Sequence, residues 1–274
     1  MAITNYAVKY SGAVDEKFTA ESKSDLCVNK DYDFVGAKTV KVYDIATSAM
    51  NDYSRTGTAR YGSVEDLNVT EQEMTMTRDR SFTFAIDKMD EDETNGALNA
   101  GKALARQLRE VVIPEVDAYR YAKLATAAGT KATPAALTAD NIYTAVTKGT
   151  ETLDDANVPI VGRYIVVSPA TYNLMKRAKD FVLDTEIAQE MKIKGVVAEI
   201  DGMQVIKVPS SMLPTNAGFI IGHSLACTSP IKLAEYKIND EPQGISGDLI
   251  EGRIYYDAFV LKNKAKAIYY HANV

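Results

Sequence analysis

The side chains that most often carry out catalysis or bind metals are sparse in this sequence. Its 274 residues include two histidines and two cysteines. His223 follows an apolar run, so we interpret it as a core or rim residue whose ring is satisfied by its neighbours rather than as a ligand. His271 has no acidic residue or cysteine at the spacing of a metal site. These patterns predict neither a metal centre nor a bound cofactor.

Motifs that bind phosphate or build a nucleophile are also absent from the sequence. The glycines of residues 218–222 (GFIIG) flank an apolar strand rather than a loop, so they do not form a phosphate cradle. No G-x-S-x-G nucleophile elbow occurs. The acidic run Asp90–Glu93 could hold a cation, but acids at the start of a helix usually form a solvated cap. We therefore identify no active site.

The thiols and the composition indicate a folded cytosolic protein. Cys27 and Cys227 lack the spacing of a metal site, and we expect both to be reduced rather than joined in a disulfide. The N-terminal residues lack the basic-then-apolar pattern of a secretory signal. No apolar run approaches the roughly twenty residues that a membrane span requires.

The net charge of −6 is unevenly distributed along the chain. Residues 50–93 hold five Lys or Arg against eleven Asp or Glu, whereas the remaining residues carry equal numbers of both signs. Nothing in this pattern matches the basic surface that grips nucleic-acid phosphates.

One long helix, residues 92–128, is the element around which we expect the chain to be organised. Asp92 or Thr94 could cap its start, and Pro114 should kink it because proline lacks the backbone donor. About 35 residues at ~1.5 Å each give a rod of order 50 Å. Its buried stripe recurs at steps of three or four residues: Leu98, Ala105, Leu108, Val112, Val116, Tyr119 and Ala122.

Extended segments precede this helix. Residues 1–37 have no sustained period and should form an arm that orders against neighbours, or else a frayed tail. Residues 38–44 alternate as a short strand. Residues 50–87 predict a long hairpin that cannot fold alone, because two strands bury too little apolar surface; its acidity predicts a basic surface beneath it. The second strand should run through Met74, Met76, Phe82, Phe84 and Ile86.

The residues after the helix alternate between short helices and strands, beginning with a flexible joint over 128–138. The closing strands should pair beside the long helix, which needs a sheet to cover its stripe. The expected elements are a helix over 138–155, a strand over 164–167, a helix from Pro169, a hairpin over 194–209 that turns at Gly202, strands over 218–222 and 231–238, a loop over 244–252, and strands over 253–261 and 265–270.

Four stretches in this order resemble the major capsid protein of tailed double-stranded DNA bacteriophages, the Hong Kong-97 fold. They are LTADNIYTAVTKGTETLDDANVP (137–159), GRYIVVSPATYNLMK (162–176), IDGMQVIKVPSSMLP (200–214) and YYDAFVLKNKAKAIYY (255–270). The resemblance covers nearly the whole chain. It implies an α+β fold with an N-terminal arm, an extended β-hairpin loop, a long spine helix with a peripheral β-sheet, and an α/β axial domain.

The resemblance also implies how the chain is divided. In this family the axial domain surrounds the axis of a hexamer or pentamer, and the extended loop lies over a neighbouring subunit. Carried over by position, the segments are the N-terminal arm and short strand (1–49), the extended loop (50–93), the spine helix (94–129), the axial domain (130–254) and the closing strands of the peripheral domain (255–274).

Two departures from the family narrow the expectation. Some relatives carry a cleaved N-terminal scaffolding region, whereas here the family-like arm begins within a few residues of Met1. We therefore expect a separate scaffolding protein or none. In one branch of the family a lysine of the extended loop forms an isopeptide bond to another subunit. No lysine occurs between Lys41 and Lys88, so we expect a non-covalent shell.

The function implied by the resemblance is structural rather than enzymatic. Subunits would assemble through hexamers and pentamers in the bacterial host cytoplasm into an icosahedral virion capsid with a portal, enclosing the genome without sequence-specific binding. An encapsulin-like cargo compartment shares the fold, and genomic neighbours would separate the two. A cytosolic α/β enzyme built on residues 130–254 is a more distant alternative, which would need a pocket of convergent titratable groups.

Charged and aromatic residues of the extended loop and the helix are the candidate subunit contacts. Lys102, Arg106 and Arg109 share one helix face and could meet an acidic loop of a neighbour, the packaged genome, or only solvent. The extended loop supplies the others: Arg55, Arg60, Tyr61, Glu65, Asp66, Glu71, Glu73, Arg78 and Arg80.

Overall fold

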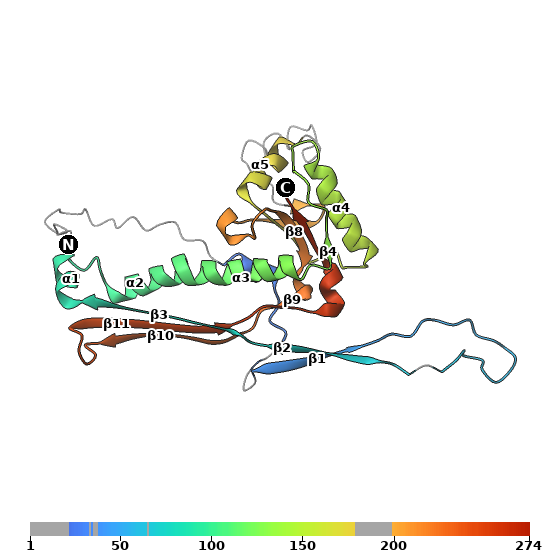
Figure 1. Ribbon diagram of the computed structural model, residues 1–274, viewed down its shortest axis with the longest axis horizontal. Helices are drawn as coiled ribbons and strands as arrows, with labels where there is room; N and C mark the ends of the chain where they lie inside the picture. The colour runs from blue at the N-terminus through green and yellow to red at the C-terminus, as the bar shows by residue number, and fades with distance from the viewer. Residues whose placement is uncertain (1–21, 33, 35–37, 65, 179–198) are drawn as a thin grey trace. The chain divides into compact units, whose positions relative to one another are not determined.

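The chain divides into two compact units. A computed structural model describes residues 22–32, 34, 38–64, 66–178 and 199–274 (Figure 1). Residues 34–76 form the smaller unit, and residues 1–33 together with 77–274 form the larger one. We describe each unit by itself.

The smaller unit is built on a two-stranded antiparallel hairpin. Strand β1 (Thr39–Ile45) pairs with β2 (Val69–Thr75), and the register runs from Thr39 opposite Thr75 to Ile45 opposite Val69. β-branched and aromatic residues along β1 favour the pleated conformation. The strand predicted over 38–44 is confirmed.

The predicted hairpin within residues 50–87 is wrong in its pairing. The single long strand expected through Met74 and Ile86 is two strands, because β3 (Arg78–Asp87) pairs with β11 (Gly247–Tyr256) in a different sheet. Between β2 and β3, the backbone N–H and hydroxyl of Thr77 donate to Asp257 Oδ2 at 2.8 and 3.0 Å. Apolar alternation continues through this point, so the period alone does not reveal the break.

The long helix is shorter than predicted and starts later. Asp87 caps a separate helix, α1 (Lys88–Glu93), by accepting from the Met89 N–H, and Asn99 caps the next one by accepting from the Gly101 N–H. Asn95 and Gly96 have φ of 54° and 71°, and such left-handed residues end a helix. The continuous helical run then comprises α2 (Ala100–Gln107), a π-helical turn η2 (Leu108–Val112) and α3 (Ile113–Thr126).

The irregularity expected at Pro114 lies in the turn before it. The Ile113 N–H donates to the Leu108 carbonyl, five residues back, where a regular helix would bond four back. Pro114 has no backbone N–H to donate, so the π-helical turn lies where the series of helical hydrogen bonds is already interrupted. The buried stripe differs from the predicted one on both sides of this turn. Val116 is buried as predicted, but Leu98 and Ala122 are exposed, and the stripe continues through Tyr121, Leu124 and Ala125.

A three-stranded sheet in the order β10-β11-β3 packs against this helical run. Ala100 packs with Ile86 and Ile250, and Val116 packs with Ile254 and Tyr256. The expectation that closing strands pair beside the long helix is confirmed for residues 231–240 and 247–256, which lie mostly in the predicted axial segment, whereas the last strand, Ile268–Ala272, pairs in a different sheet. The loop predicted over 244–252 is wrong from Gly247 onward, where β11 begins. The strands are β10 (Ile231–Asp240) and β11 (Gly247–Tyr256) with β3.

The second sheet of the larger unit has six strands in the order β4-β13-β8-β5-β7-β6. β5 lies at its centre and runs parallel to β7 and antiparallel to β8. All five residues of β5 are buried, as expected for a strand covered on both faces. The strands are β4 (Thr130–Lys131), β5 (Arg163–Val167), β6 (Glu199–Ile200), β7 (Met203–Lys207), β8 (Ala217–His223) and β13 (Ile268–Ala272).

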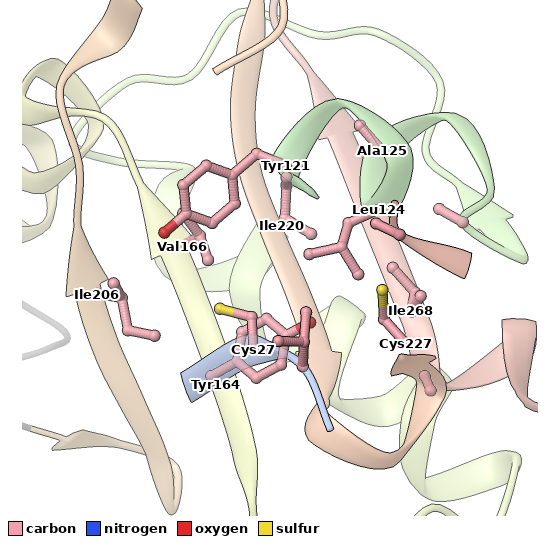
Figure 2. Packing of buried hydrophobic residues seen from close by; sticks show 14 of the residues in the cluster. Cys27, Tyr121, Leu124, Ala125, Tyr164, Val166, Ile206, Ile220, Cys227 and Ile268 are labelled. Carbon is pink, nitrogen blue, oxygen red and sulfur yellow. The ribbon is translucent and has the colours of Figure 1, made fainter. Parts of the chain in front are cut away.

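Helices cover both faces of this sheet. Ile142, Val146 and Leu153 of α4 (Ile142–Asp155) pack on one face together with α5 (Pro169–Arg177). Figure 2 shows the other face, where Tyr121 and Leu124 of α3 are directed toward the sheet and share a cluster with Cys27 and Cys227. Both thiols are buried and free, which confirms the prediction of reduced cysteines.

Most elements predicted after the long helix are confirmed. α4 buries its three predicted residues; α5 starts at Pro169 with Ser168 as its cap; and Gly202, at φ 71°, turns the β6–β7 hairpin. Residues 194–198 of that predicted hairpin lie outside the described residues. The strand predicted over 265–270 is displaced, because η6 (Lys262–Ala267) is a 3-10 helix and β13 follows it. Other short elements are η1 (Ser24–Cys27), η4 (Ser210–Met212), η5 (Ser224–Ala226), β9 (Cys227–Thr228) and β12 (Phe259–Val260).

Close backbone contact at the end of α3 makes Gly129 a stability determinant. A Cβ atom there would lie 2.5 Å from the Ala265 carbonyl oxygen and 2.7 Å from the Lys266 nitrogen, both backbone atoms. We expect Gly129→Ala to lower the free energy of unfolding by about 2 kcal/mol, measured by urea denaturation. Gly101→Ala is the control: its Cβ would meet only the Asn99 side chain, and alanine favours the helix, so equal losses in both variants would contradict this account.

Candidate subunit-contact surfaces

The histidines are structural in this fold. The Leu225 N–H donates to His223 Nδ1 at 3.1 Å, so His223 Nε2 carries the proton and donates to the Val161 carbonyl at 2.8 Å. The prediction of a satisfied rim histidine is confirmed. Within the described residues no group of three or more metal-ligating side chains comes together, and no helix is long and apolar enough to span a membrane.

His271 on β13 is buried against an aromatic ring. Its imidazole stacks on Phe219 with 5.0 Å between ring centroids. No hydrogen-bond partner reaches its buried Nδ1 among the described residues. Burial lowers the pKa of His271 below its ordinary value, because the low-dielectric surroundings disfavour the imidazolium.

The start of the described chain is attached to α3 by a buried carboxylate. Asp117 accepts from the hydroxyls of Ser22 and Ser24 at 2.7 and 2.6 Å, and from the Lys23 N–H at 3.1 Å. Its side chain is almost fully buried. Three donors satisfy this carboxylate, which would otherwise be costly to remove from water. We call this set of contacts the arm anchor.

Arg120, one turn further along α3, completes the arm anchor. Its Nε donates to Ser229 Oγ at 2.8 Å, and its Nη1 donates to Ser24 and to Asp25 Oδ1. The sequence reasoning missed Asp117 and Arg120. The available signal was an acid and a base three residues apart beside the buried Val116, a spacing that places both on one helix face.

Two predicted contact residues on β3 are engaged within the subunit. Arg80 Nε donates to Glu115 Oε1 at 2.7 Å, and the Arg78 guanidinium lies 4.7 Å from the centroid of the Tyr119 ring. Arg78 also pairs with Glu115 at 3.8 Å. These contacts join β3 to α3, so neither arginine is reserved for a neighbour.

The helix cations differ in their surroundings. Arg106 Nε pairs with Glu110 Oε2 at 3.1 Å, one turn along the helix. Lys102 and Arg109 are exposed. Arg109 lies within the π-helical turn Leu108–Val112. Its spacing from Lys102 and Arg106 is therefore not that of the regular helix assumed in the sequence prediction.

A charge cluster crosses the two strands of the smaller unit. Lys41 Nζ lies 3.0 Å from Glu71 and 3.2 Å from Glu73, both on the opposite strand. The hydrogen bonds that Lys41 donates to these carboxylates raise the pKa of Lys41. Two predicted contact residues, Glu71 and Glu73, are therefore held in place by cross-strand pairing.

The connection between β1 and β2 is almost entirely exposed. Arg60 Nε donates to the Gly57 carbonyl at 3.1 Å, and Tyr61 packs edge-on against Tyr53 at 5.1 Å between ring centroids. Arg55 and Asp66 are exposed, and Glu65 lies outside the described residues. Large apolar side chains are exposed throughout this connection: Met50, Tyr53, Tyr61, Val64 and Leu67. The candidate contacts thus fall into separate sets on the two units.

Comparison with known proteins gives a family and a fold. A family model described as phage capsid protein matches residues 70–270. A solved structure from Mycobacterium phage Che8 is 19% identical, with TM-score 0.74 and 98% of each chain covered. The capsid structure of the cyanophage P-SCSP1u is 15% identical, with TM-score 0.78, covering 97% of this chain and 92% of that one. The mature capsid of bacteriophage PhiM1 is 13% identical, with TM-score 0.75, covering 97% and 91%. No curated protein matches the chain.

Loss of the arm anchor should expose Cys27, which burial renders unreactive by raising its pKa. In a Cys227→Ala background, we expect Asp117→Ala to raise the rate of Cys27 modification by a thiol reagent at least about tenfold, since losing one charge-assisted hydrogen bond costs roughly 1.5–3 kcal/mol. Asp140→Ala, an exposed position, serves as control. Unchanged labelling in a folded Asp117→Ala variant would contradict the anchoring role.

Burial of neutral His271 predicts acid sensitivity. A histidine whose pKa is lower in the folded state contributes stability above its unfolded pKa of 6.5, and this contribution is lost as the pH falls. We expect the urea midpoint to drop between about pH 7.5 and about pH 5.5 more in the unchanged chain than in His271→Phe, which keeps a ring against Phe219. Equal drops would show that His271 carries none of the effect.

Proposed function

The chain belongs to the phage capsid protein family, and we propose that it assembles through hexamers and pentamers into an icosahedral shell around double-stranded DNA. The family makes it a structural component of a phage virion rather than an enzyme, as the sequence predicted. Its fold is of the Hong Kong-97 type, also as predicted. The proposal concerns the capsomers, the contacts and the partners.

The connection between β1 and β2 is the observation that carries the proposal. Isolated two-stranded hairpins are marginally stable in water, and this one leads to a connection with five large exposed apolar side chains. Large apolar side chains exposed in this number mark a binding site for another protein. We infer that the smaller unit lies over a neighbouring subunit, where these side chains become buried.

Charge supports the same arrangement. The smaller unit and the residues after it are acidic, with Glu71 and Glu73 exposed on β2. Lys102 and Arg109 are exposed cations on the helical run. Opposite charges across an interface steer association and set register more than they add affinity. The acidic unit of one subunit would therefore meet the helix cations of the next.

The shell would be held without covalent links. The segment between Lys41 and Lys88 contains no lysine to act as an isopeptide nucleophile. The charge outside residues 50–93 is balanced, which suits a container that encloses DNA without sequence-specific binding. A portal and a separate scaffolding protein would assist assembly in the cytoplasm of the bacterial host.

Particle size tests the proposal directly. The chain would be expressed alone and with a candidate scaffolding protein, then measured by light scattering and electron microscopy. Closed shells, or rings of capsomer size, are the expected result. A strict monomer or dimer under both conditions would contradict it.

Removal of the exposed connection should abolish assembly but not folding. We expect deletion of residues 54–64 to leave β1 and β2 paired and the thermal midpoint of the larger unit within about 2 °C of the unchanged chain. Particles should be lost. A matched variant with residues 54–64 replaced by a Gly-Ser linker of equal length separates side-chain contacts from loop length. Normal shells from either variant would refute the role of this connection.

A further inference from the structure

One end of the six-stranded sheet gathers four chain segments that the proposed contacts do not use. Arg163 at the start of β5 lies opposite His223 at the end of β8, and Ile268 at the start of β13 lies opposite Gly222. β7 begins at this end too, because it runs parallel to β5. The adjoining segments are residues 160–162, 224–226, 264–267 and 201–202. We call them together the sheet end.

The centre of the sheet end is apolar and exposed. Ile160 is 62% exposed, Val161 88% and Leu225 43%. Ile160 and Val161 immediately precede β5, and Leu225 follows β8, so the three side chains come from neighbouring strands. An exposed apolar patch shared by separate segments is costly to leave in water and marks an interaction surface.

This apolar centre is held rigid by buried polar groups. Arg163, with its side chain almost fully buried, donates to the carbonyls of Val158 and Pro159 and pairs with Asp154 at the end of α4. His223 joins the two segments through the Val161 carbonyl and the Leu225 N–H. Gly162, at φ 95°, allows this approach, since a Cβ there would lie 3.2 Å from the imidazole. A preorganised surface loses little entropy on binding.

Opposite charges flank the two sides of the apolar centre. Lys264 and Lys266 lie in η6, just before β13, and η6 contacts η5, which contains Leu225. Asp201 precedes β7, and the end of α4, which includes Asp155, is held at the start of β5 by the ion pair of Asp154 with Arg163. Following the strand order β13-β8-β5-β7, the sheet end therefore runs from basic through apolar to acidic.

We propose that the sheet end is a contact surface for a second copy of this chain. A copy turned so that its lysine side meets the acidic side of the first pairs both charges and buries both apolar centres. DNA or any other partner of uniform charge would be repelled at one side. The inference rests on the proposed shell assembly, in which every subunit has other copies as neighbours. Because the contact would recur at every subunit, a small change in its binding energy would have a large effect on assembly.

Charge reversal in pairs tests the contact. We expect Lys266→Glu and Asp155→Lys each to lower the yield of assembled particles about tenfold or more, while the combined variant recovers to within about threefold, as coupled sites do in a double-mutant cycle. Val161→Ser should also lower the yield but leave the thermal midpoint unchanged, because Val161 is exposed in the subunit. Arg177→Glu, at the exposed last residue of α5, makes the same charge change as Lys266→Glu and serves as the control.

Two failures are distinguishable in this experiment. Absence of particles from the unchanged chain would contradict the proposed function itself. Particles from the unchanged chain together with normal yields from both single reversals, or a combined variant no better than either, would overturn only the sheet-end contact. The latter result would also follow if another segment of the same chain, rather than a second copy, covered the apolar centre.

Discussion

The larger unit depends on one helical run whose two halves are buried against two different sheets. Ala100 and Val116 pack on the three-stranded sheet, whereas Tyr121 and Leu124 pack on the six-stranded one. Val116 and Tyr121 both lie in α3, after the π-helical turn at Leu108–Val112, and five residues at about 100° each place them on different faces of that helix. One continuous helical run thereby supports both sheets and also carries the arm anchor through Asp117 and Arg120.

Sequence reasoning succeeded where local chemistry decides the structure. β5 reads as a continuous apolar run, Ser168-Pro169 is a helix start, and Gly202 supplies a left-handed turn; all three are confirmed. It failed where distant residues decide. Nothing near Thr77 reveals that Asp257 holds its backbone, and the 23 residues between β1 and β2 hide their pairing. The helix start was misplaced because Asp92 and Asn99 are both good N-cap residues. Only the left-handed conformation of Asn95 and Gly96, between them, shows that the long helix begins after Asn99.

The candidate contacts show the same division. Charge and exposure could be anticipated for Lys102, Arg109 and the exposed connection, because solvated side chains need no partner. Composition does not reveal that Arg78 and Arg80 are engaged by Glu115, or that Asp117 and Arg120 are buried. The sheet end was equally inaccessible to sequence reasoning, since its four segments lie up to about a hundred residues apart and only the strand register assembles them. Family membership was anticipated because it rests on the order of whole segments rather than on any single contact.

The Lys41 cluster has a consequence for how the molecule responds to salt. Lys41, Glu71 and Glu73 are exposed, so ions in solution screen their attraction over about 8–10 Å at ordinary ionic strength. The contacts of Asp117 and Arg120 are buried and are screened far less. Raising the salt concentration therefore loosens the strand pair while the larger unit keeps its core. Amide hydrogens of β1 and β2 would exchange with solvent faster at high salt, and those of β5 and β8 would not. The ionic strength therefore sets how stable the strand pair is relative to the six-stranded sheet.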